Sequence, residues 1–321
     1  MNQASDDAMT PLRVSSAGPI ATDIHQFELV RDDGGDLPAF TAGAHLRVQT
    51  PGGQIRCYSL TNDPAERHRY VIAVKREPAG RGGSAGMIDQ VRAGDLLPVS
   101  APRNDFPLAG NPARYIFIAG GIGITPILSM IRHLEASEGK PFKLYYLTRS
   151  ADTTAFLDEL TAPERRGRVV IHHDGGDAAA GFDLWPVLAQ PNGAHVYCCG
   201  PRGLMEAVKD MTGHWPTSAV HFEDFGIGAA AAVDNQPFTI RLAQSGRELA
   251  VPADRSILET LRANGVTVAS SCESGTCGTC RTGLVAGEPD HRDLVLAPYE
   301  RDRNIMVCVS RACGGTLVLD L

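Results

Sequence analysis

The chain has 321 residues, of which 43% are hydrophobic and 21% charged, values typical of a soluble globular protein with room for two or three domains. Its formal net charge of −7 argues against a nucleic-acid-binding protein that depends on a basic surface. Residues 1–11 carry two aspartates and no apolar run, so we expect no secretory leader, and the apolar stretch 115–128 is too short and glycine-rich to span a membrane. We therefore expect a cytoplasmic protein whose cysteines stay reduced.

The first part of the chain has the pattern of short strands separated by turns. Residues 45–50 alternate between apolar and polar side chains, and residues 70–77 are rich in β-branched side chains. Glycine-rich connections lie beside them, at 50–54 and 79–84. This spacing predicts an antiparallel barrel or sandwich, and we place the domain at residues 1–109.

From Arg114 onward, strands and helices alternate. Residues 115–120 form a buried strand pattern, and a helix is expected from about Thr125, with Ile127, Leu128, Ile131 and Leu134 at helical spacing. The further elements expected are strands at 143–148, 168–173, 195–200 and 219–224 and helices near 155–160 and 204–211. This order predicts a doubly wound parallel α/β domain over residues 110–226.

The last part of the chain predicts a small α+β domain. Residues 227–236 are small and polar and are expected to be a linker, with the third domain at 237–321. Its first strand has Phe238, Ile240 and Leu242 on one face. A short helix should follow, capped by Asp254 or Ser256 and ended by Gly265.

Four cysteines of this third domain have the spacing of an iron–sulfur site. The sequence SCESGTCGTC contains a C-x4-C-x2-C pattern, and one more cysteine follows later. Two irons bridged by two sulfides need two thiolates each, and a plant-type [2Fe–2S] cluster has this spacing. Structural zinc favours two C-x2-C pairs, a nucleophile needs one thiol, and disulfides conflict with a reducing compartment. The predicted ligands are Cys272, Cys277, Cys280 and Cys308.

Three other cysteines are expected to be packed structural thiols. Cys57 and Cys198 fall within apolar strand patterns, and Cys313 fits no ligand position.

Two glycine-bearing segments are candidates for binding phosphate groups. Residues 119–126, AGGIGITP, connect the first strand of the α/β domain to its first helix, and a helix N-terminus favours the charge of a pyrophosphate. Pro126 stands where the third glycine of the usual fingerprint would be, so the segment alone could be an ordinary tight turn. In the β domain, Arg56 and the sequence Gly82-Gly83-Ser84 could hold a phosphate or could be an exposed arginine and a loop.

Taken together and in this order, the motifs R-x-Y-S, G-G-S, G-G-I-G-I-T-P, C-G-P, E-D-F and C-x4-C-x2-C…C resemble the phthalate dioxygenase reductase family. This family is a branch of the ferredoxin–NADP reductase superfamily, and the resemblance covers nearly the whole chain. It implies FMN in a β-barrel, NADH in the α/β domain and a [2Fe–2S] cluster in a β-grasp, plant-type ferredoxin domain. It also implies a separate terminal oxygenase of the Rieske type as the electron acceptor.

The resemblance assigns roles by position. Ser59 is expected near the reactive flavin nitrogen, Thr125 close to the flavin, and Phe225 over the flavin ring where nicotinamide enters; these three are the candidate catalytic residues. The flavin contacts it implies are Arg56, Cys57, Tyr58, Ser59, Ala73, Val74, Lys75, Gly82, Gly83, Ser84, Thr125 and Phe225. The dinucleotide contacts it implies are Gly121, Gly123, Ile124, Arg149, Ser150, Cys199, Gly200 and Pro201.

NADH is favoured over NADPH, because Asp152 follows Arg149 closely and no second basic residue is near for a 2′-phosphate. The triplet His172-His173-Asp174 is interpreted as a loop edge and not as a metal site. The expected function is that of a monomeric reductase that takes hydride from NADH onto FMN and passes single electrons to an aromatic-ring or demethylating oxygenase. Two alternatives stay open: a stand-alone NAD(P)H flavin or ferric reductase acting on small acceptors, and a ferredoxin-type binding module without catalysis.

Overall fold

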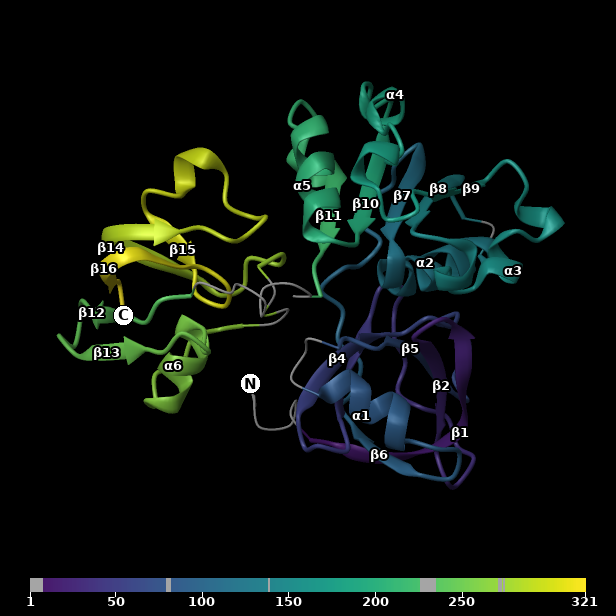
Figure 1. Cartoon of the computed structure of the whole chain (residues 1–321), viewed down its shortest axis with the longest axis horizontal. Coiled ribbons are helices and arrows are strands. Elements are labelled where there is room, and N and C mark those ends of the chain that lie inside the picture. The colour runs from purple at the N-terminus through teal and green to yellow at the C-terminus, as the bar shows by residue number, and fades with distance from the viewer. Residues whose placement is uncertain (1–7, 79–81, 138, 226–234, 271–272, 274) are drawn as a thin grey trace. The chain divides into compact units, whose positions relative to one another are not determined.

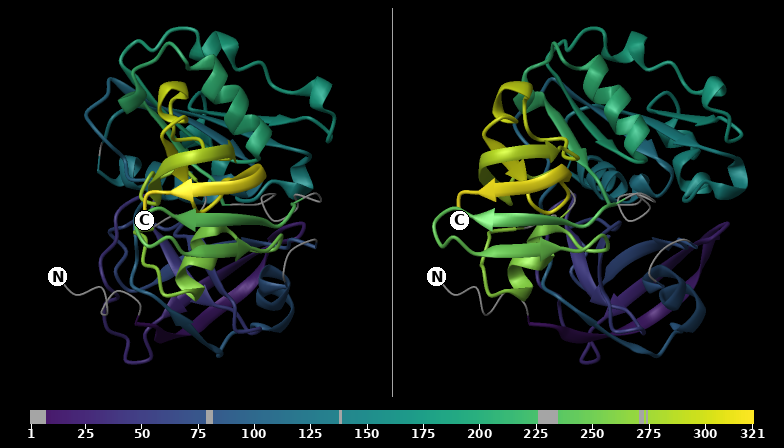
Figure 2. Two further views of the ribbon diagram at one scale, coloured as in Figure 1. Left: turned by 90° about the vertical axis from the view of Figure 1, so that its left-hand side faces the viewer. Right: turned by 60° about the vertical axis from the view of Figure 1, so that its left-hand side comes forward.

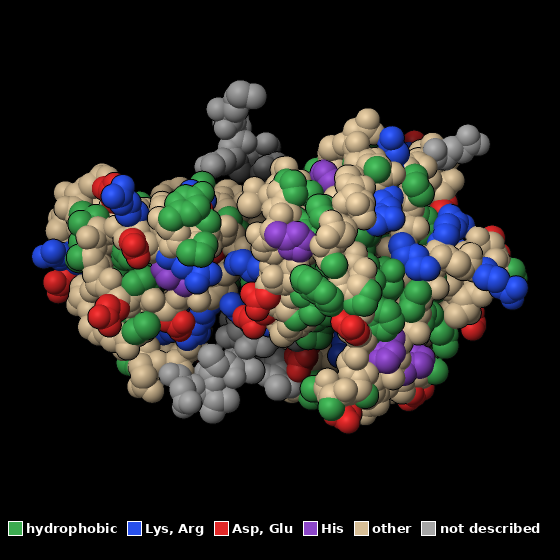
Figure 3. Space-filling view, turned by 90° about the horizontal axis from the view of Figure 1, so that it is seen from above, with side chains coloured by type: hydrophobic (Ala, Val, Ile, Leu, Met, Phe, Trp, Pro, Cys, Tyr) green, Lys and Arg blue, Asp and Glu red, His purple; other side chains and the backbone are tan. Residues whose placement is uncertain are grey.

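The computed structural model describes residues 8–78, 82–137, 139–225, 235–270, 273 and 275–321 (Figure 1). The chain forms two compact units, Met1–Phe222 and Glu223–Leu321. Within the described part of the chain, every helix is too short or too polar to cross a bilayer. Positive and negative side chains both occur across the face drawn in Figure 3, in keeping with the modest net charge.

The first unit begins with a six-stranded antiparallel sheet in the order β4-β3-β6-β1-β2-β5. A bridge between Leu60 and Ile72 joins the two edge strands and so closes the sheet into a barrel. Its interior is filled by alternating side chains such as Phe27, Leu46 and Val48. The strands are β1 (Thr10–Ala21), β2 (Ile24–Val30), β3 (His45–Gln49), β4 (Ile55–Ser59), β5 (Tyr70–Lys75) and β6 (Leu96–Val99).

The Gly-Gly-Ser segment of the barrel is the start of a helix, where the sequence indicated only a loop. Helix α1 (Gly83–Gln90) follows Gly82, whose φ of 83° is left-handed and suits glycine. Glycine at positions 83 and 86 has low helix propensity, but Met87 and Ile88 of the same helix are buried. Packing of these two side chains outweighs the weak local preference.

The first unit continues with a five-stranded parallel sheet in the order β11-β10-β7-β8-β9. The chain passes from β7 to β8 on one side of the sheet and from β10 to β11 on the other side. Because both crossovers are right-handed, helices α2 and α5 lie on opposite faces of the sheet. The direction in which strands are added to the sheet reverses between β7 and β10. The main elements are β7 (Arg114–Gly120), α2 (Ile124–Ala136), β8 (Phe142–Thr148), β9 (Val169–His173), β10 (Ala194–Cys199), α5 (Arg202–Met211) and β11 (Val220–Glu223).

The helix expected near 155–160 is only one turn, α3 (Leu157–Leu160). It cannot begin earlier because Phe156 has a left-handed φ of 58°. The remaining short elements are η2 (Gly121–Gly123), η3 (Ala151–Thr153), η4 (Pro163–Arg165), η5 (Ala178–Ala180), α4 (Trp185–Leu188) and η6 (Thr217–Ala219).

The second unit has a mixed five-stranded sheet in the order β13-β12-β16-β14-β15, with α6 packed against it (Figure 2). Strands β12 and β16 are parallel and the other pairs antiparallel, as in a β-grasp fold. Ser256 is the helix cap, and it forms a capping box with Glu259. The elements are β12 (Phe238–Leu242), β13 (Glu248–Val251), α6 (Ile257–Ala263), β14 (Arg281–Asp290), η8 (Pro298–Glu300), β15 (Asn304–Met306) and β16 (Arg311–Leu319).

Most of the predicted linker lies outside the described residues, and the domain boundaries stay predictions. Its last two residues are hydrogen-bonded to the second unit: Arg292 donates to Asn235 Oδ1 at 2.9 Å, and Arg311 to the Gln236 carbonyl at 3.1 Å. The predictions for two cysteines were wrong. Cys57 and Cys313 are exposed, because each falls on the outward side of its strand, whereas Cys198 is buried as expected.

Candidate cofactor sites

The end of β4 carries two buried hydroxyl groups that no described residue satisfies. Ser59 is 3% exposed, and neither its Oγ nor Tyr58 Oη has a hydrogen-bond partner within the part of the chain that the structure describes. Burial raises the pKa of Tyr58 to about 12, although the nearby charge of Arg56 acts in the opposite direction. Both groups are therefore neutral donors at physiological pH. Buried polar groups in proteins are normally paired, so these two fit a ligand rich in nitrogen and oxygen atoms, such as a flavin ring.

Beside this strand end, Arg56 and α1 form a cradle for an anion. A Cβ at Gly83 would lie 3.0 Å from Arg56 Nε, so the absence of a side chain there lets the guanidinium approach the first turn of the helix. Ser84 Oγ accepts a hydrogen bond from the Glu77 amide at 3.0 Å and so ties the start of α1 to the end of the preceding strand. A cation beside a helix N-terminus suits a phosphate group.

The neighbouring strand β5 presents two different faces. The Val74 side chain is 1% exposed and packs in the barrel core, whereas Ala73 points the other way and Lys75 is exposed. Of these three residues, Ala73 and Lys75 therefore lie on the face away from the barrel interior. Strand β5 also lies beside η2, which precedes α2. This arrangement brings the predicted flavin strand next to the predicted dinucleotide loop.

The dinucleotide loop closes on the end of β10 at the point where the sheet reverses. A Cβ at Gly123 would lie 2.2 Å from the Cys199 carbonyl oxygen, and one at Gly120 would lie 2.5 Å from Pro201 Cδ. Only glycine permits these approaches. Ligands of open α/β sheets bind at such a reversal point, beyond the carboxyl ends of the strands.

The first turn of α2 is held rigidly. Thr125 is 2% exposed, and its Oγ1 donates to the Ile122 carbonyl at 3.0 Å. Gly121 has a φ of 53°, which suits glycine, and Ile124 is fully buried. The structure thus places Gly121, Gly123, Ile124, Thr125 and the Cys199-Gly200-Pro201 turn together, as the sequence predicts.

The end of β8 offers a polar site with an acidic group. Ser150 forms a capping box with Thr153, and Arg149 is exposed beside it. A hydrogen bond from Ser150, more than any other contact, lowers the pKa of Asp152. An ionised carboxylate here favours a ribose hydroxyl and disfavours a 2′-phosphate. Of the triplet at the end of β9, His173 bonds to Thr148 Oγ1 at 2.8 Å and His172 to the Ala180 carbonyl at 2.7 Å.

Two of the predicted cluster ligands meet in the core of the second unit. Cys280 Sγ and Cys308 Sγ are 3.0 Å apart, and both side chains are buried. Cys277 is partly buried, with its Sγ 3.2 Å from Thr279 Oγ1, and Cys272 lies outside the described residues. The described residues contain no group of three or more metal-ligating side chains. Paired buried thiols beside a glycine-rich loop fit a [2Fe–2S] cluster, since thiolates are its usual ligands.

Phe225 follows β11 by two residues in the chain and is partly buried. It belongs to the second compact unit, so its place over the flavin stays a prediction.

Two family models match the chain. The 2Fe-2S iron-sulfur cluster binding domain matches residues 240–313, a range that spans all four predicted ligands, and the oxidoreductase NAD-binding domain matches residues 117–210.

Curated relatives match over the full length. The phthalate 4,5-dioxygenase oxygenase reductase subunit of Pseudomonas putida is 58% identical over 317 residues, which cover 98% of each chain. The phthalate dioxygenase reductase of Burkholderia cepacia is 54% identical over 322 residues, which cover 100% of each chain. The solved structure of a phthalate dioxygenase reductase, described as a modular structure for electron transfer from pyridine nucleotides to [2Fe-2S], aligns with a TM-score of 0.79 at 55% identity and covers 98% of each chain.

Proposed function

Because the chain belongs to the phthalate dioxygenase reductase family, we propose that it supplies electrons from NADH to the Rieske-type terminal oxygenase of a two-component system. The chain is an NADH-dependent iron–sulfur flavoprotein oxidoreductase, and its cofactors are FMN, NADH and a [2Fe–2S] cluster. The observation that carries the proposal is the full-length match, in which the NAD-binding and iron–sulfur regions occur in one chain and in the same order as in the relatives.

The oxygenase partner is inferred from the relatives. Both curated relatives described above are named as reductases of phthalate dioxygenases, which supports a partner that hydroxylates an aromatic acid. We further propose that the protein is cytoplasmic, because the cytoplasm keeps the cluster thiols reduced and contains NADH. We also propose that it is a monomer.

Bound FMN supplies the conversion of a two-electron donor into a one-electron donor. The chain's own residues bind the flavin and orient it. The buried hydroxyls of Tyr58 and Ser59 would donate hydrogen bonds to the flavin, and Arg56 with the start of α1 would balance its phosphate charge. Thr125 fixes the first turn of α2, between the two proposed binding regions. The family resemblance assigns Phe225 to the place on the flavin where nicotinamide would enter.

At the dinucleotide end, the ionised Asp152 selects NADH by repelling a 2′-phosphate. The close approach of Gly123 to the Cys199 carbonyl keeps the loop narrow enough for the backbone to contact a pyrophosphate.

Replacement of one cluster ligand tests the route of the electrons. Cys277→Ser should lose most NADH-driven reduction of cytochrome c, a one-electron protein acceptor, because the cluster is damaged. Its NADH-driven reduction of ferricyanide should stay within about twofold of wild type, because the flavin site is untouched. Both rates are measured on protein with full FMN content.

The matched control is Cys313→Ser, which changes an exposed cysteine of the same unit. It should keep both activities. Unchanged cytochrome c reduction by the FMN-loaded Cys277→Ser protein would contradict electron flow through the cluster and would favour a stand-alone reductase for small acceptors.

A further inference from the structure

Helix α2 contacts both the dinucleotide loop and the flavin strand. Thr125 lies in its first turn, and Ser129 and Arg132 follow at positions i+4 and i+7, so the three side chains share one face. Ser129 Oγ donates to the Asn62 carbonyl at 2.9 Å, and Arg132 Nη1 donates to the Thr61 carbonyl at 2.8 Å. The helix is thus hydrogen-bonded to the barrel at two successive carbonyls.

Those two carbonyls directly follow the catalytic end of β4. Thr61 comes two residues after Ser59, and its amide donates to the Val71 carbonyl of β5 at 2.8 Å. Asn62 Oδ1 accepts from the Val71 amide at 3.0 Å. A single short segment therefore links the strand that carries Ser59, the strand that carries Ala73, and the helix that carries Thr125.

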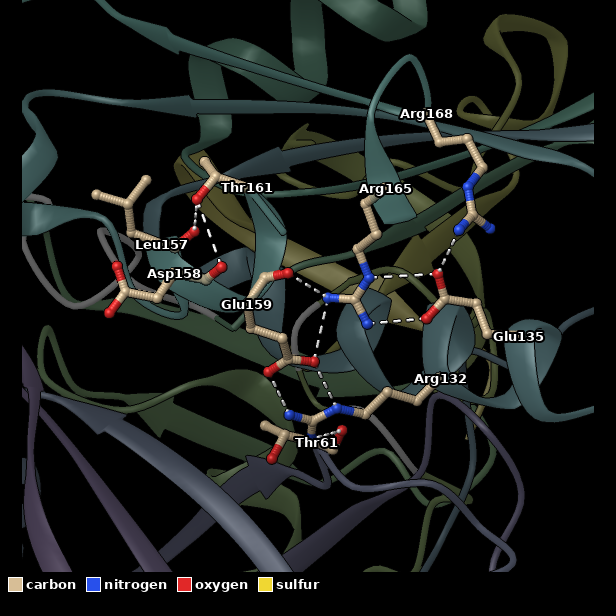
Figure 4. A network of polar contacts seen from close by, with 9 residues as sticks. All are labelled: Thr61, Arg132, Glu135, Leu157, Asp158, Glu159, Thr161, Arg165 and Arg168. Carbon is tan, nitrogen blue, oxygen red and sulfur yellow. Dashed lines mark hydrogen bonds and ion pairs between the residues drawn. The ribbon is translucent and has the colours of Figure 1, made fainter. Parts of the chain in front are cut away.

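Arg132 is held in place by an ion-pair network on its other side (Figure 4). Its Nε and Nη2 bond to the two carboxylate oxygens of Glu159 at 3.0 and 2.6 Å. Arg165, which is 7% exposed, bonds to the same carboxylate at 3.2 Å and to the Glu159 carbonyl at 3.0 Å. Arg165 also forms a bidentate pair with Glu135, at 3.2 and 2.8 Å, and Arg168 bonds to Glu135 at 3.2 Å.

The Glu159 carboxylate remains charged, so the network persists at neutral pH. Burial acts to raise the pKa of Glu159, but the hydrogen bond from Arg132 and the charges of Arg132 and Arg165 lower it on balance. A guanidinium presents a rigid planar fork that can bind a carboxylate by one edge and still donate to a carbonyl by another, which an ammonium group cannot do.

We propose that Arg132 is a positioning residue for hydride transfer: held by Glu159, it fixes the Ser59 end of the flavin strand relative to the turn that carries Thr125. The inference rests on the proposed function. It concerns the distance between the hydride donor and acceptor, not the affinity for either cofactor. Misplacement of reacting groups by about 1 Å can lower a rate about a hundredfold.

The test is anaerobic stopped-flow reduction of the FMN-loaded, full-length protein by NADH. In Arg132→Met, the limiting rate of flavin bleaching should fall by about 10- to 100-fold. The apparent Kd for NADH should stay within about twofold, and the deuterium isotope effect with [4-²H]NADH should stay the same or increase. General destabilisation of the protein would also lower the flavin content or weaken NADH binding. A lower limiting rate with unchanged flavin content and unchanged Kd for NADH therefore indicates a positioning role. Arg132→Lys should be slowed as well, because an ammonium cannot make both sets of bonds.

The matched control is Arg168→Gln, which belongs to the same network but bonds to Glu135 and makes none of the barrel contacts described above. NADH should reduce the flavin of this variant at the wild-type rate. A wild-type limiting rate in Arg132→Met would overturn the proposal. If Arg132→Met does not fold, Glu159→Gln removes the charge that holds Arg132, and a wild-type limiting rate in that variant overturns the proposal equally. Wild-type protein that NADH fails to bleach would contradict the proposed function instead.

Discussion

At the scale of single residues, the proposed flavin site is marked by polar atoms that the described part of the chain leaves unpaired. A buried hydroxyl without a partner costs about 1–3 kcal/mol, so natural proteins seldom keep one without a use. Ser59 Oγ and Tyr58 Oη are such atoms, and they lie at the end of one strand. We infer that their stabilisation comes from the bound cofactor.

Ser59→Ala should therefore separate stability from function. The free energy of unfolding of the apo-protein should stay the same or rise by about 1 kcal/mol, because the deleted hydroxyl has no partner among the residues that the structure describes. Flavin reduction by NADH should slow about tenfold, because one oriented donor is lost. Urea denaturation and stopped-flow absorbance measure the two quantities. An unchanged reduction rate would remove Ser59 from the catalytic site.

Residue identity was predictable where a motif constrains it, and residue exposure was not. The motif R-x-Y-S led to Tyr58 and Ser59, which both carry buried hydroxyls at the end of β4, and their contact with the flavin stays a prediction. Cys57, in the same motif, was expected to be packed, but strand alternation turns it outward. One apolar residue in a short strand does not reveal which face the sheet buries.

At the scale of elements, strong apolar periodicity predicted a helix correctly, whereas local residue propensity failed to predict another. Helix α2 follows from Ile127, Leu128, Ile131 and Leu134, all of which are buried. Helix α1 was missed because its glycines disfavour a helix, and only the burial of Met87 against the barrel core explains it. Tertiary packing is not visible in a local pattern.

The contact between β10 and β11 predicts a pH dependence of stability. His221 stacks on Tyr197 with ring centroids 4.3 Å apart, and its Nε2 lies 3.2 Å from His195 Nδ1. Burial, and to a lesser extent the charge of His195, lowers the pKa of His221 to about 4. The unfolded chain binds this proton near its ordinary pKa of about 6.5, so the stabilising contribution is complete above that pH and is lost as pH falls toward 4.

We expect His221 to account for about 1–2 kcal/mol of lost stability between pH 7 and 4.5, after allowance for partial solvent screening. In His221→Phe, which keeps a ring against Tyr197, this loss should be absent. Urea denaturation followed by tryptophan fluorescence measures it, because both tryptophans, Trp185 and Trp215, lie in the first unit. His133→Gln on α2 is the control and should keep the wild-type slope. Equal slopes in His221→Phe and wild type would contradict the assignment.

At the scale of the whole molecule, the order of the NAD-binding and iron–sulfur regions could be read from the sequence, because each carries its own motif. The long-range polar contacts could not be predicted from the sequence. Arg132 and Thr61 are 71 residues apart, and neither belongs to a motif, so only the folded chain reveals that one helix holds both binding regions. The barrel and the parallel sheet accordingly form one compact unit, and the iron–sulfur domain forms the other.

The central claim is that NADH, flavin and cluster form one electron-transfer line within this chain. Anaerobic titration of the purified protein with NADH, followed by absorption spectroscopy, tests it most directly. We predict that the flavin and [2Fe–2S] bands bleach together and that about three electrons are taken up per chain, two on the flavin and one on the cluster. Bleaching of the flavin while the absorbance of an intact cluster stays unchanged would contradict the account.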